Sequence, residues 1–345
     1  MKLFTRLFVT VAISAAMVPA ITSCKKAGDK KAADDKKPAD DKAGGGQGEQ
    51  PADQPAPAGS DEKFAIITHG SSGDAFWDVV KKGAEQAGAD LGVGVTYRSN
   101  GDAAQQADLI NTAVTEKANG IVVSMANPDA LAEPIKKAIA AGIPVITINS
   151  GSAKSAELGA LAHVGQEETI AGQGAGKRLK EAGVKKLLCV VHEAGNIGLE
   201  QRCSGAKQGL GGTVVNLQVD ISNVGEAQNT IGSKLQADKA IDGVLALNPA
   251  IGIAAADATA AAGSKAKVAT FDLSGDVVDA IAAGKVLFAV DQQQYLQGYL
   301  PVVMLHLYAS NANTIGGGQP VLTGPGFVTK ENAAKVKDLA AKGTR

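Results

Sequence analysis

The stretch GIVVSMANPDALAEPIKKAIAAGIPVITIN, residues 120–149, contains a complete strand–helix–strand unit. Short apolar, β-rich runs at 120–124 and 143–148 enclose an amphipathic stretch at 128–141. Gly142 and Pro144 predict that the helix ends in front of the second strand, because both residues are common at or just beyond helix C-termini. Alternating units of this kind specify right-handed crossovers and a parallel sheet.

The same unit repeats from residue 63 towards the end of the chain. Apolar runs predict strands at 64–68, 93–97, 120–124 and 143–148, and then at 186–191, 213–219, 243–247, 267–271 and 286–290. Helical spacing predicts helices at 75–91, 102–118, 128–141, 166–182, 198–210, 224–237, 250–262 and 275–283, followed by helices near 293–312 and 329–342. Chains of this size split into domains, so we predict an α/β fold with two doubly wound parallel-sheet lobes.

The composition agrees with this prediction and excludes other classes. Hydrophobic residues make up 45% of the chain and charged residues 20%, which excludes a wholly disordered protein. The formal net charge of −1 gives no support for nucleic-acid binding. Aromatic residues are only 3%, so the core must consist of small aliphatic side chains, as is usual for a parallel sheet between helices.

The N-terminus predicts export and lipid anchoring. In residues 1–23, Lys2 and Arg6 precede an apolar segment that is short for a membrane span and lacks a stop-transfer pattern. The alternatives are a buried helix or a membrane anchor. The segment ends Ile-Thr-Ser-Cys24, which resembles a bacterial lipobox, so we expect lipidated Cys24 to begin a mature periplasmic or cell-surface lipoprotein.

Residues 24–62 are predicted to connect that lipid to the folded part. After Cys24 the segment contains Ala, Gly, Pro, Gln, Ser and charged residues, but no large apolar residue. Such a composition does not repay the entropy cost of ordering, so we expect a disordered tether.

Two cysteines, Cys189 and Cys203, remain after Cys24. In an exported protein they can form a disulfide. A loop of about 15 residues would be closed, for which the chain-entropy model gives about 3 kcal/mol. Two inert buried thiols are the alternative.

Polar residues recur directly after the predicted strands, where open α/β sheets bind ligands. These positions, with the aromatic residues of the first one, are Asp74, Phe76, Trp77, Asn127, Asn149, Asn248, Asp272 and Gln292. Amides and carboxylates pair with hydroxyl groups, and an aromatic ring lies against apolar C–H faces. The set predicts a neutral polyhydroxylated ligand, although Asp272 alone fits a helix N-cap and Trp77 alone fits ordinary packing. His69 and His192 fit a cleft or a structural role equally well.

In this order the residues resemble the periplasmic sugar-binding proteins of ABC transporters, of the ribose- and galactose-binding type. The motifs are 74–77, the strand 143–149 that ends in an amide, and 195–202, which resembles the segment that delivers the family's ligand-binding arginine, here Arg202. The resemblance implies that Asn248, Asp272 and Gln292 match three further ligand contacts. It also implies delivery of a small neutral sugar or polyol to ABC permease subunits, with no cofactor, no metal and no nucleic acid. We expect a monomer.

The resemblance further implies the type I fold of periplasmic binding proteins, with a hinge of three segments between the lobes. The N-terminal lobe is expected at 63–165 plus 293–319, and the C-terminal lobe at 166–292 plus 320–338. Ligand would lie between the lobes and close them by a hinge motion. Arg202 and Asp272 are expected to be the strongest polar contacts to it, whereas a structural ion pair between them is the alternative.

The chain also departs from these families. Ser150 stands where ribose binders carry an arginine, Asn196 and Gly198 stand where galactose binders carry His and Asp, and residues 218–228 contain no aromatic residue for a second wall. The resemblance therefore does not identify the sugar.

Three other functions are alternatives. An enzyme acting on sugars lacks a convincing catalytic set, since the glycine spacing of 172–177 does not fit a phosphate loop and predicts close helix packing instead. A sugar-responsive repressor would need a DNA-binding headpiece in place of residues 1–62. A sensor that presents ligand to a chemoreceptor or sensor kinase has the same sequence features as a transport protein.

Overall fold

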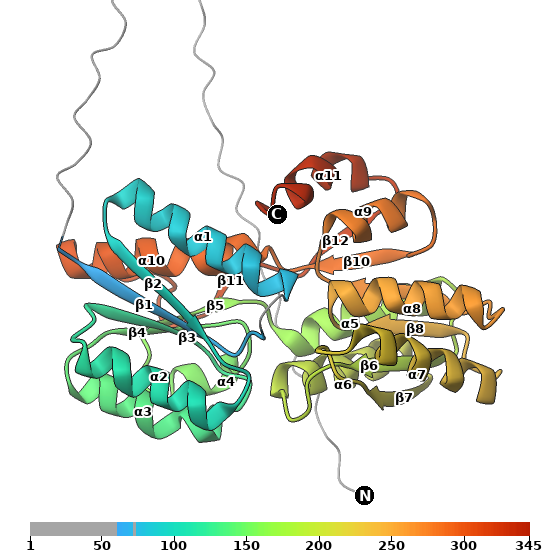
Figure 1. The fold of residues 1–345 in the computed structure, drawn as a ribbon, viewed down its shortest axis with the longest axis horizontal. Helices are drawn as coiled ribbons and strands as arrows, with labels where there is room; N and C mark the ends of the chain where they lie inside the picture. Colours follow the sequence, from blue (N-terminus) through green and yellow to red (C-terminus); the bar gives the residue numbers. More distant parts are fainter. Residues whose placement is uncertain (1–60, 72–73) are drawn as a thin grey trace, which may run out of the picture. The chain divides into compact units, whose positions relative to one another are not determined.

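The computed structural model describes residues 61–71 and 74–345, which contain two six-stranded sheets (Figure 1). This confirms the predicted α/β fold with two parallel-sheet lobes. The expected signal peptide, Cys24 and the expected tether, apart from residues 61–62, lie outside the described residues.

The first sheet has the strand order β11-β5-β4-β3-β1-β2. Its strands are β1 (Lys63–Thr68), β2 (Gly94–Ser99), β3 (Gly120–Ser124), β4 (Val145–Ile148), β5 (Ala162–Gly165) and β11 (Val321–Leu322). Helices α1 (Ala75–Leu91) and α10 (Gln294–Asn311) cover one face, and α2 (Ala103–Thr115) and α3 (Pro128–Ala140) cover the other, while the short α4 (Ser152–Ser155) follows β4. Alternate residues of β1 point to opposite faces, so Ile66 packs under α1 and α10 and Ile67 packs under α2 and α3.

The second sheet has the order β12-β10-β9-β8-β6-β7, with β12 antiparallel to β10. Its strands are β6 (Lys186–Val191), β7 (Thr213–Gln218), β8 (Gly243–Ala246), β9 (Lys267–Phe271), β10 (Phe288–Asp291) and β12 (Gly326–Thr329). Helices α5 (Glu168–Glu181) and α6 (Ile197–Leu210) cover one face. The other face carries α7 (Val224–Ala237), α8 (Pro249–Ala261), α9 (Gly275–Ala282) and α11 (Ala333–Ala341).

Glycines allow α5 and α6 to pack with their backbones in close contact. A Cβ atom at Gly172 would collide with the carbonyl oxygen of Arg202, and one at Gly176 would collide with the carbonyl oxygen of Ala206. On α6, a Cβ at Gly205 would meet the backbone of α5 in the same way. The prediction that the glycine-rich segment 172–177 serves close helix packing is therefore confirmed.

Cys189 in β6 and Cys203 in α6 form the expected disulfide, with their Cα atoms 5.9 Å apart. Both side chains lie in the core between the second sheet and its helices α5 and α6. The alternative of two free thiols is wrong for this chain. The bond joins the strand to the helix that carries Arg202.

Three short strands were not predicted. The chain passes from the first sheet to the second between β5 and β6, returns between β10 and β11, and passes again between β11 and β12. Because β11 pairs with β5, residues 321–322 belong to the first sheet, whereas the expected boundary at 319–320 assigned them to the C-terminal lobe. Residues 326–329 form β12, so the last helix begins at Ala333 rather than near 329.

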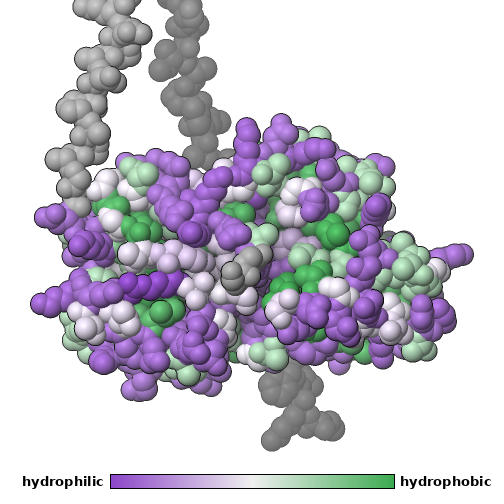
Figure 2. All heavy atoms as spheres, viewed as in Figure 1, coloured by the Kyte–Doolittle hydropathy of each residue, from purple (hydrophilic) through white to green (hydrophobic). Residues whose placement is uncertain are grey.

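The surface is mostly hydrophilic in the view of Figure 2, with apolar residues in small separate patches. Among the described residues, no helix is both long and apolar enough to span a membrane.

Candidate ligand-binding site

Residues at the carboxyl ends of strands from both sheets surround a small cavity. Its lining residues are His69, Asp74, Phe76, Trp77, Asn149, His192, Glu193, Asn196, Leu199, Arg202, Leu247, Asn248, Asp272 and Gln292. All the candidate residues from the sequence except Asn127 are in this set. The cavity volume is about 20 Å³, which leaves room for about one water molecule.

Asn127 does not line the cavity. It is exposed and caps α3, where its Oδ1 accepts a hydrogen bond from the backbone N–H of Ala130. An amide directly after a strand fits either a ligand contact or an N-cap, and at Asn127 the observed contact is the N-cap.

The start of α1 supplies the aromatic side of the cavity. Asp74 is the N-cap of α1, and its Oδ1 accepts a hydrogen bond from Phe76 N–H at 3.0 Å. This turn places Phe76 and Trp77 edge to face, with ring centroids 4.8 Å apart. Trp77 is also in edge contact with His69, whose centroid lies 4.7 Å away. Phe76 and Trp77 belong both to the core of the first lobe and to the wall of the cavity.

Arg202 is fixed by a carboxylate that sequence reasoning missed. Its Nε lies 2.6 Å from Glu168 Oε2 and its Nη2 2.9 Å from Glu168 Oε1, a bidentate pair with both side chains buried. Burial opposes the charge of the guanidinium, but Glu168 outweighs burial and raises the pKa of Arg202. Glu168 opens α5 directly after the unpredicted strand β5, and from sequence it fits an ordinary acidic residue in a first helical turn.

The remaining donor of Arg202 faces Asp272. Arg202 Nη1 lies 3.9 Å from Asp272 Oδ2 and donates a hydrogen bond to the Leu247 carbonyl at 3.3 Å. The main ion pair of Arg202 is therefore with Glu168, and the structural ion pair between Arg202 and Asp272 that was the alternative is present beside it at the longer distance. Nη1 and the Asp272 carboxyl both lie at the cavity.

Two carboxyl groups of the cavity have raised pKa values. Burial raises the pKa of Asp272 to about 8, although Arg202 and a 2.8 Å hydrogen bond from Gln292 Nε2 act in the opposite direction. Burial also raises the pKa of Asp74 to about 6, against its hydrogen bond from Phe76 N–H. These values mean that hydrogen bonds within the protein do not fully compensate either carboxylate.

His69 and His192 both line the cavity. His69 Nδ1 lies 2.7 Å from Ser124 Oγ, and burial lowers the pKa of His69, with Glu193 acting in the opposite direction. Burial lowers the pKa of His192 to about 4. Both rings are therefore neutral at pH 7 and each has one donor and one acceptor nitrogen.

Several of these side chains bond to one another from opposite sheets. Asn248 Nδ2 donates to Asp74 Oδ1 at 3.2 Å, and Asn149 Nδ2 donates to Gln292 Oε1 at 3.2 Å. Asn196 Oδ1 accepts a hydrogen bond from Ser150 Oγ at 3.1 Å. A ligand the size of a sugar ring must displace some of these bonds, since the present cavity holds about one water.

Two lobes joined by three crossings of the chain, with a cavity lined by residues at the carboxyl ends of strands from both sheets, define a two-lobed solute-binding protein. The chain belongs to the family described as periplasmic binding protein domain, whose model matches residues 64–313. Its fold is that of the type I periplasmic binding proteins.

Similar proteins bind or transport sugars. A carbohydrate transporter from Acidothermus cellulolyticus, solved in complex with myo-inositol, is 43% identical with a TM-score of 0.82, and the match covers 83% of this chain and 100% of that chain. The xylose/arabinose-binding protein of Sulfolobus acidocaldarius is 25% identical over 65% of this chain, and the match spans only 60% of that protein. The ribose import binding protein of Haemophilus influenzae is 26% identical over 66% of this chain and 79% of that protein. The family is one of binding proteins, and these three relatives are a carbohydrate transporter and two binding proteins.

Proposed function

We propose that the protein captures a small neutral sugar or polyol between its lobes and delivers it to an ABC permease. The observation that carries this proposal is the convergence of Asp74, Trp77, Asn149, Arg202, Asn248, Asp272 and Gln292 on one cavity. Carboxyl and amide groups bind hydroxyls, and the Phe76–Trp77 edge offers an apolar surface to a sugar ring. The relative solved with myo-inositol supports this ligand class.

The charges at the site favour a neutral ligand over an anion. Arg202 is the only arginine, and there is no lysine, among the described residues that line the small cavity. Glu168 already neutralises its charge at 2.6 Å. An anionic ligand would therefore meet Glu193 without a free cation to balance it, whereas hydroxyl groups would not incur that cost.

Direct titration tests the ligand class. Myo-inositol, D-ribose, D-arabinose and D-allose are each titrated into the purified protein, with melting temperature as a second readout. A ligand at 100 times its dissociation constant should add about 2.7 kcal/mol to the free energy of unfolding. Asp272→Ala should weaken the binding of the sugar or polyol tenfold to a hundredfold, because a buried ligand hydroxyl left without its partner costs about 1–3 kcal/mol. If none of these ligands and no other neutral polyol binds, the proposal is wrong.

Delivery to a permease has its own test. Cells that take up the identified ligand should lose this uptake when either the protein or its partner permease is removed. Uptake that persists without the protein, together with the loss of a chemotactic or transcriptional response, would assign the protein to sensing instead.

We propose that a lipid on Cys24 holds the protein at the membrane, with residues 25–62 as the tether. The support is the sequence alone: a short apolar segment, the lipobox and a segment without large apolar residues. The wild type should enter the detergent phase in a two-phase partition, and Cys24→Ala should enter the aqueous phase. A wild type found in the aqueous phase contradicts the anchor.

A further inference from the structure

A second and much larger cavity adjoins the small one. Its volume is about 640 Å³, within the range of about 300–1,000 Å³ that is usual for small-molecule sites. The two cavities share His69, His192, Glu193 and Asn196 as lining residues. A ligand bound in the small cavity would therefore have the larger one directly beside it.

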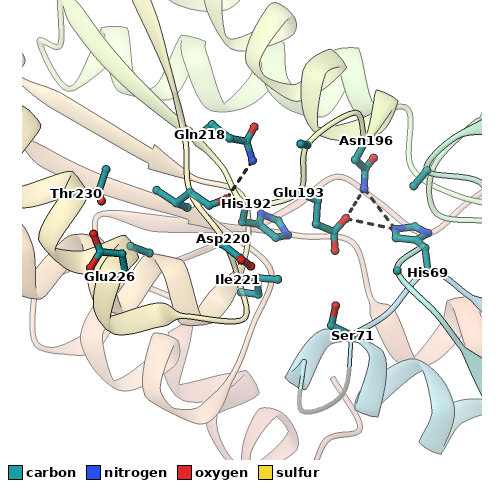
Figure 3. Close-up of a pocket in the computed structure, with 15 residues that line it drawn as sticks. His69, Ser71, His192, Glu193, Asn196, Gln218, Asp220, Ile221, Glu226 and Thr230 are labelled. Carbon is teal, nitrogen blue, oxygen red and sulfur yellow. Dashed lines mark hydrogen bonds and ion pairs between the residues drawn. The ribbon is translucent and has the colours of Figure 1, made fainter. Parts of the chain in front are cut away.

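The larger cavity is built from both lobes. Ser71, Gly101 and Ala126 line it from the first, while the end of β7 and the first turns of α7 line it from the second. Figure 3 shows Glu226 and Thr230 at one end of this cavity and His69 at the other, with His192 and Glu193 between them.

The charges on this lining have one sign. Glu193, Asp220 and Glu226 contribute carboxylates, and the described lining residues include neither lysine nor arginine. Asp220 accepts a hydrogen bond from Ser222 N–H at 2.8 Å, which lowers its pKa. Burial opposes the ionisation of Glu193, but His69, His192, the hydrogen bond from Asn196 and the charge of Arg202 together outweigh burial and lower its pKa. Arg202 in the small cavity acts on Glu193 as an opposite charge, but Glu168 already pairs with it.

His192 provides an independent sign of a ligand. It is only 6% exposed, it lies on the wall shared by the two cavities, and its Nδ1 has no hydrogen-bond partner among the described residues. A buried polar atom without a partner is destabilising, and a ligand hydroxyl at this wall would supply the missing hydrogen bond. The neutral imidazole accepts from such a hydroxyl with one nitrogen and donates with the other.

We propose that the larger cavity is a second subsite for an uncharged, hydroxylated ring attached to the ring in the small cavity, so that the preferred ligand is a two-ring glycoside. This inference rests on the proposed function. The volume accommodates the second ring, His192 and Glu193 bond to its hydroxyls, and the three carboxylates repel a phosphorylated or carboxylated group.

Titration with matched probes tests the size of the ligand. Myo-inositol is compared with galactosyl-myo-inositol, and D-galactose is compared with melibiose, which adds a second ring. The two-ring member of the pair that binds should have at least tenfold higher affinity. If a single-ring probe binds and neither two-ring probe binds more tightly than its single-ring counterpart, the subsite is overturned and the proposed function stays intact. If no probe of either pair binds, the two-ring subsite is overturned, while the proposed function stands or falls with the single-ring titrations described for it.

Filling the cavity tests its location. Thr230 is half-buried on α7, outside the small cavity, so Thr230→Trp places an indole in the larger cavity only. It should weaken the two-ring probe at least tenfold and the single-ring probe less than threefold. Asn229→Trp, on the neighbouring exposed position outside both cavities, is the matched control and should change neither. An unchanged two-ring affinity in a folded Thr230→Trp protein overturns the location.

A charged probe tests the role of the carboxylates. A two-ring probe whose second ring carries a carboxylate should bind the wild type at least tenfold more weakly than its neutral counterpart. The double variant Asp220→Asn, Glu226→Gln should bind the charged probe at least threefold more tightly than the wild type does. Equal affinity of the charged and neutral probes for the wild type contradicts the proposed selectivity.

Discussion

The two walls of the small cavity are built in different ways. On the first-sheet side, Asp74, Phe76 and Trp77 also cap α1 and pack its first turn. On the second-sheet side, Arg202 and Glu168 form a buried ion pair, and the carboxyl group of Asp272 lies beside it. A side chain with a local role tolerates substitution according to that role, whereas a buried charge without its partner is strongly destabilising. We therefore expect the second-sheet wall to be the more sensitive.

The largest effect is expected from Glu168→Gln, which leaves the buried guanidinium of Arg202 without its counter-charge. Removing one partner of a buried pair costs about 3–5 kcal/mol. Denaturant unfolding should show this loss, while Glu181→Gln at the exposed end of the same helix should stay within about 0.5 kcal/mol of wild type. A loss below about 1 kcal/mol for Glu168→Gln would show that the two walls are equally tolerant.

Removal of the disulfide should have the next largest effect, again on the second-sheet side. The double substitution Cys189→Ala and Cys203→Ala should lower the free energy of unfolding by about 3 kcal/mol, because the unfolded chain regains the freedom of a loop of about 15 residues. Equilibrium unfolding with and without reductant measures this, and reductant should have no effect on the double variant. An equal effect of reductant on both proteins would contradict the role of the bond.

The pH dependence should separate the walls on a smaller scale. Asp272 has a folded pKa of about 8, above the ordinary value of 3.8, so the folded state keeps a proton that the unfolded state loses. Stability therefore falls as the pH rises towards 8, by on the order of 1 kcal/mol per pH unit. Between pH 7 and 8 the histidines with lowered pKa values add little, since they are mostly neutral in both states. Asp272→Asn should remove the slope in this interval, and an unchanged slope would assign it to another group.

The smallest expected effect is on the first-sheet wall. Asp74→Ala removes the N-cap of α1 and should cost about 1 kcal/mol, whereas Asp74→Asn retains a capping oxygen and should cost less than about 0.5 kcal/mol. Thermal unfolding of the two variants checks this. A loss for Asp74→Asn as large as that of Glu168→Gln would remove the contrast between the walls.

The elements that were predicted and those that were missed differ in length and burial. Residues 120–124 are five buried residues in a central strand, and the observed β3 has these same bounds. The strand β5 has four residues, Ala-His-Val-Gly, of which only Val164 strongly favours a strand. The strand β11 has two residues, too few for any periodic pattern. Tertiary pairing rather than local sequence determines such strands.

The site was predictable to the extent that parallel strands bring their carboxyl ends together. That rule placed Asp74, Asn149, Asn248 and Asp272 at one cavity before their distances were known. The rule did not find Glu168. Its partner Arg202 lies 34 residues further along the chain, on the helix that packs against the helix of Glu168. No local pattern indicates which acidic residue in a first turn has a distant partner.

The close packing of α5 on α6 has a consequence for how mutations spread their effects. Glu168 and Arg202 belong to different helices, so their 2.6 Å contact depends on the distance between the two backbones. A methyl group at Gly176, two turns along α5 from Glu168, would collide with the backbone of α6. The helices would have to separate, and Arg202 would move with its helix. A random-mutagenesis screen for weakened ligand binding should therefore recover alanine at Gly172, Gly176 and Gly205, although such variants would change no atom that touches the ligand.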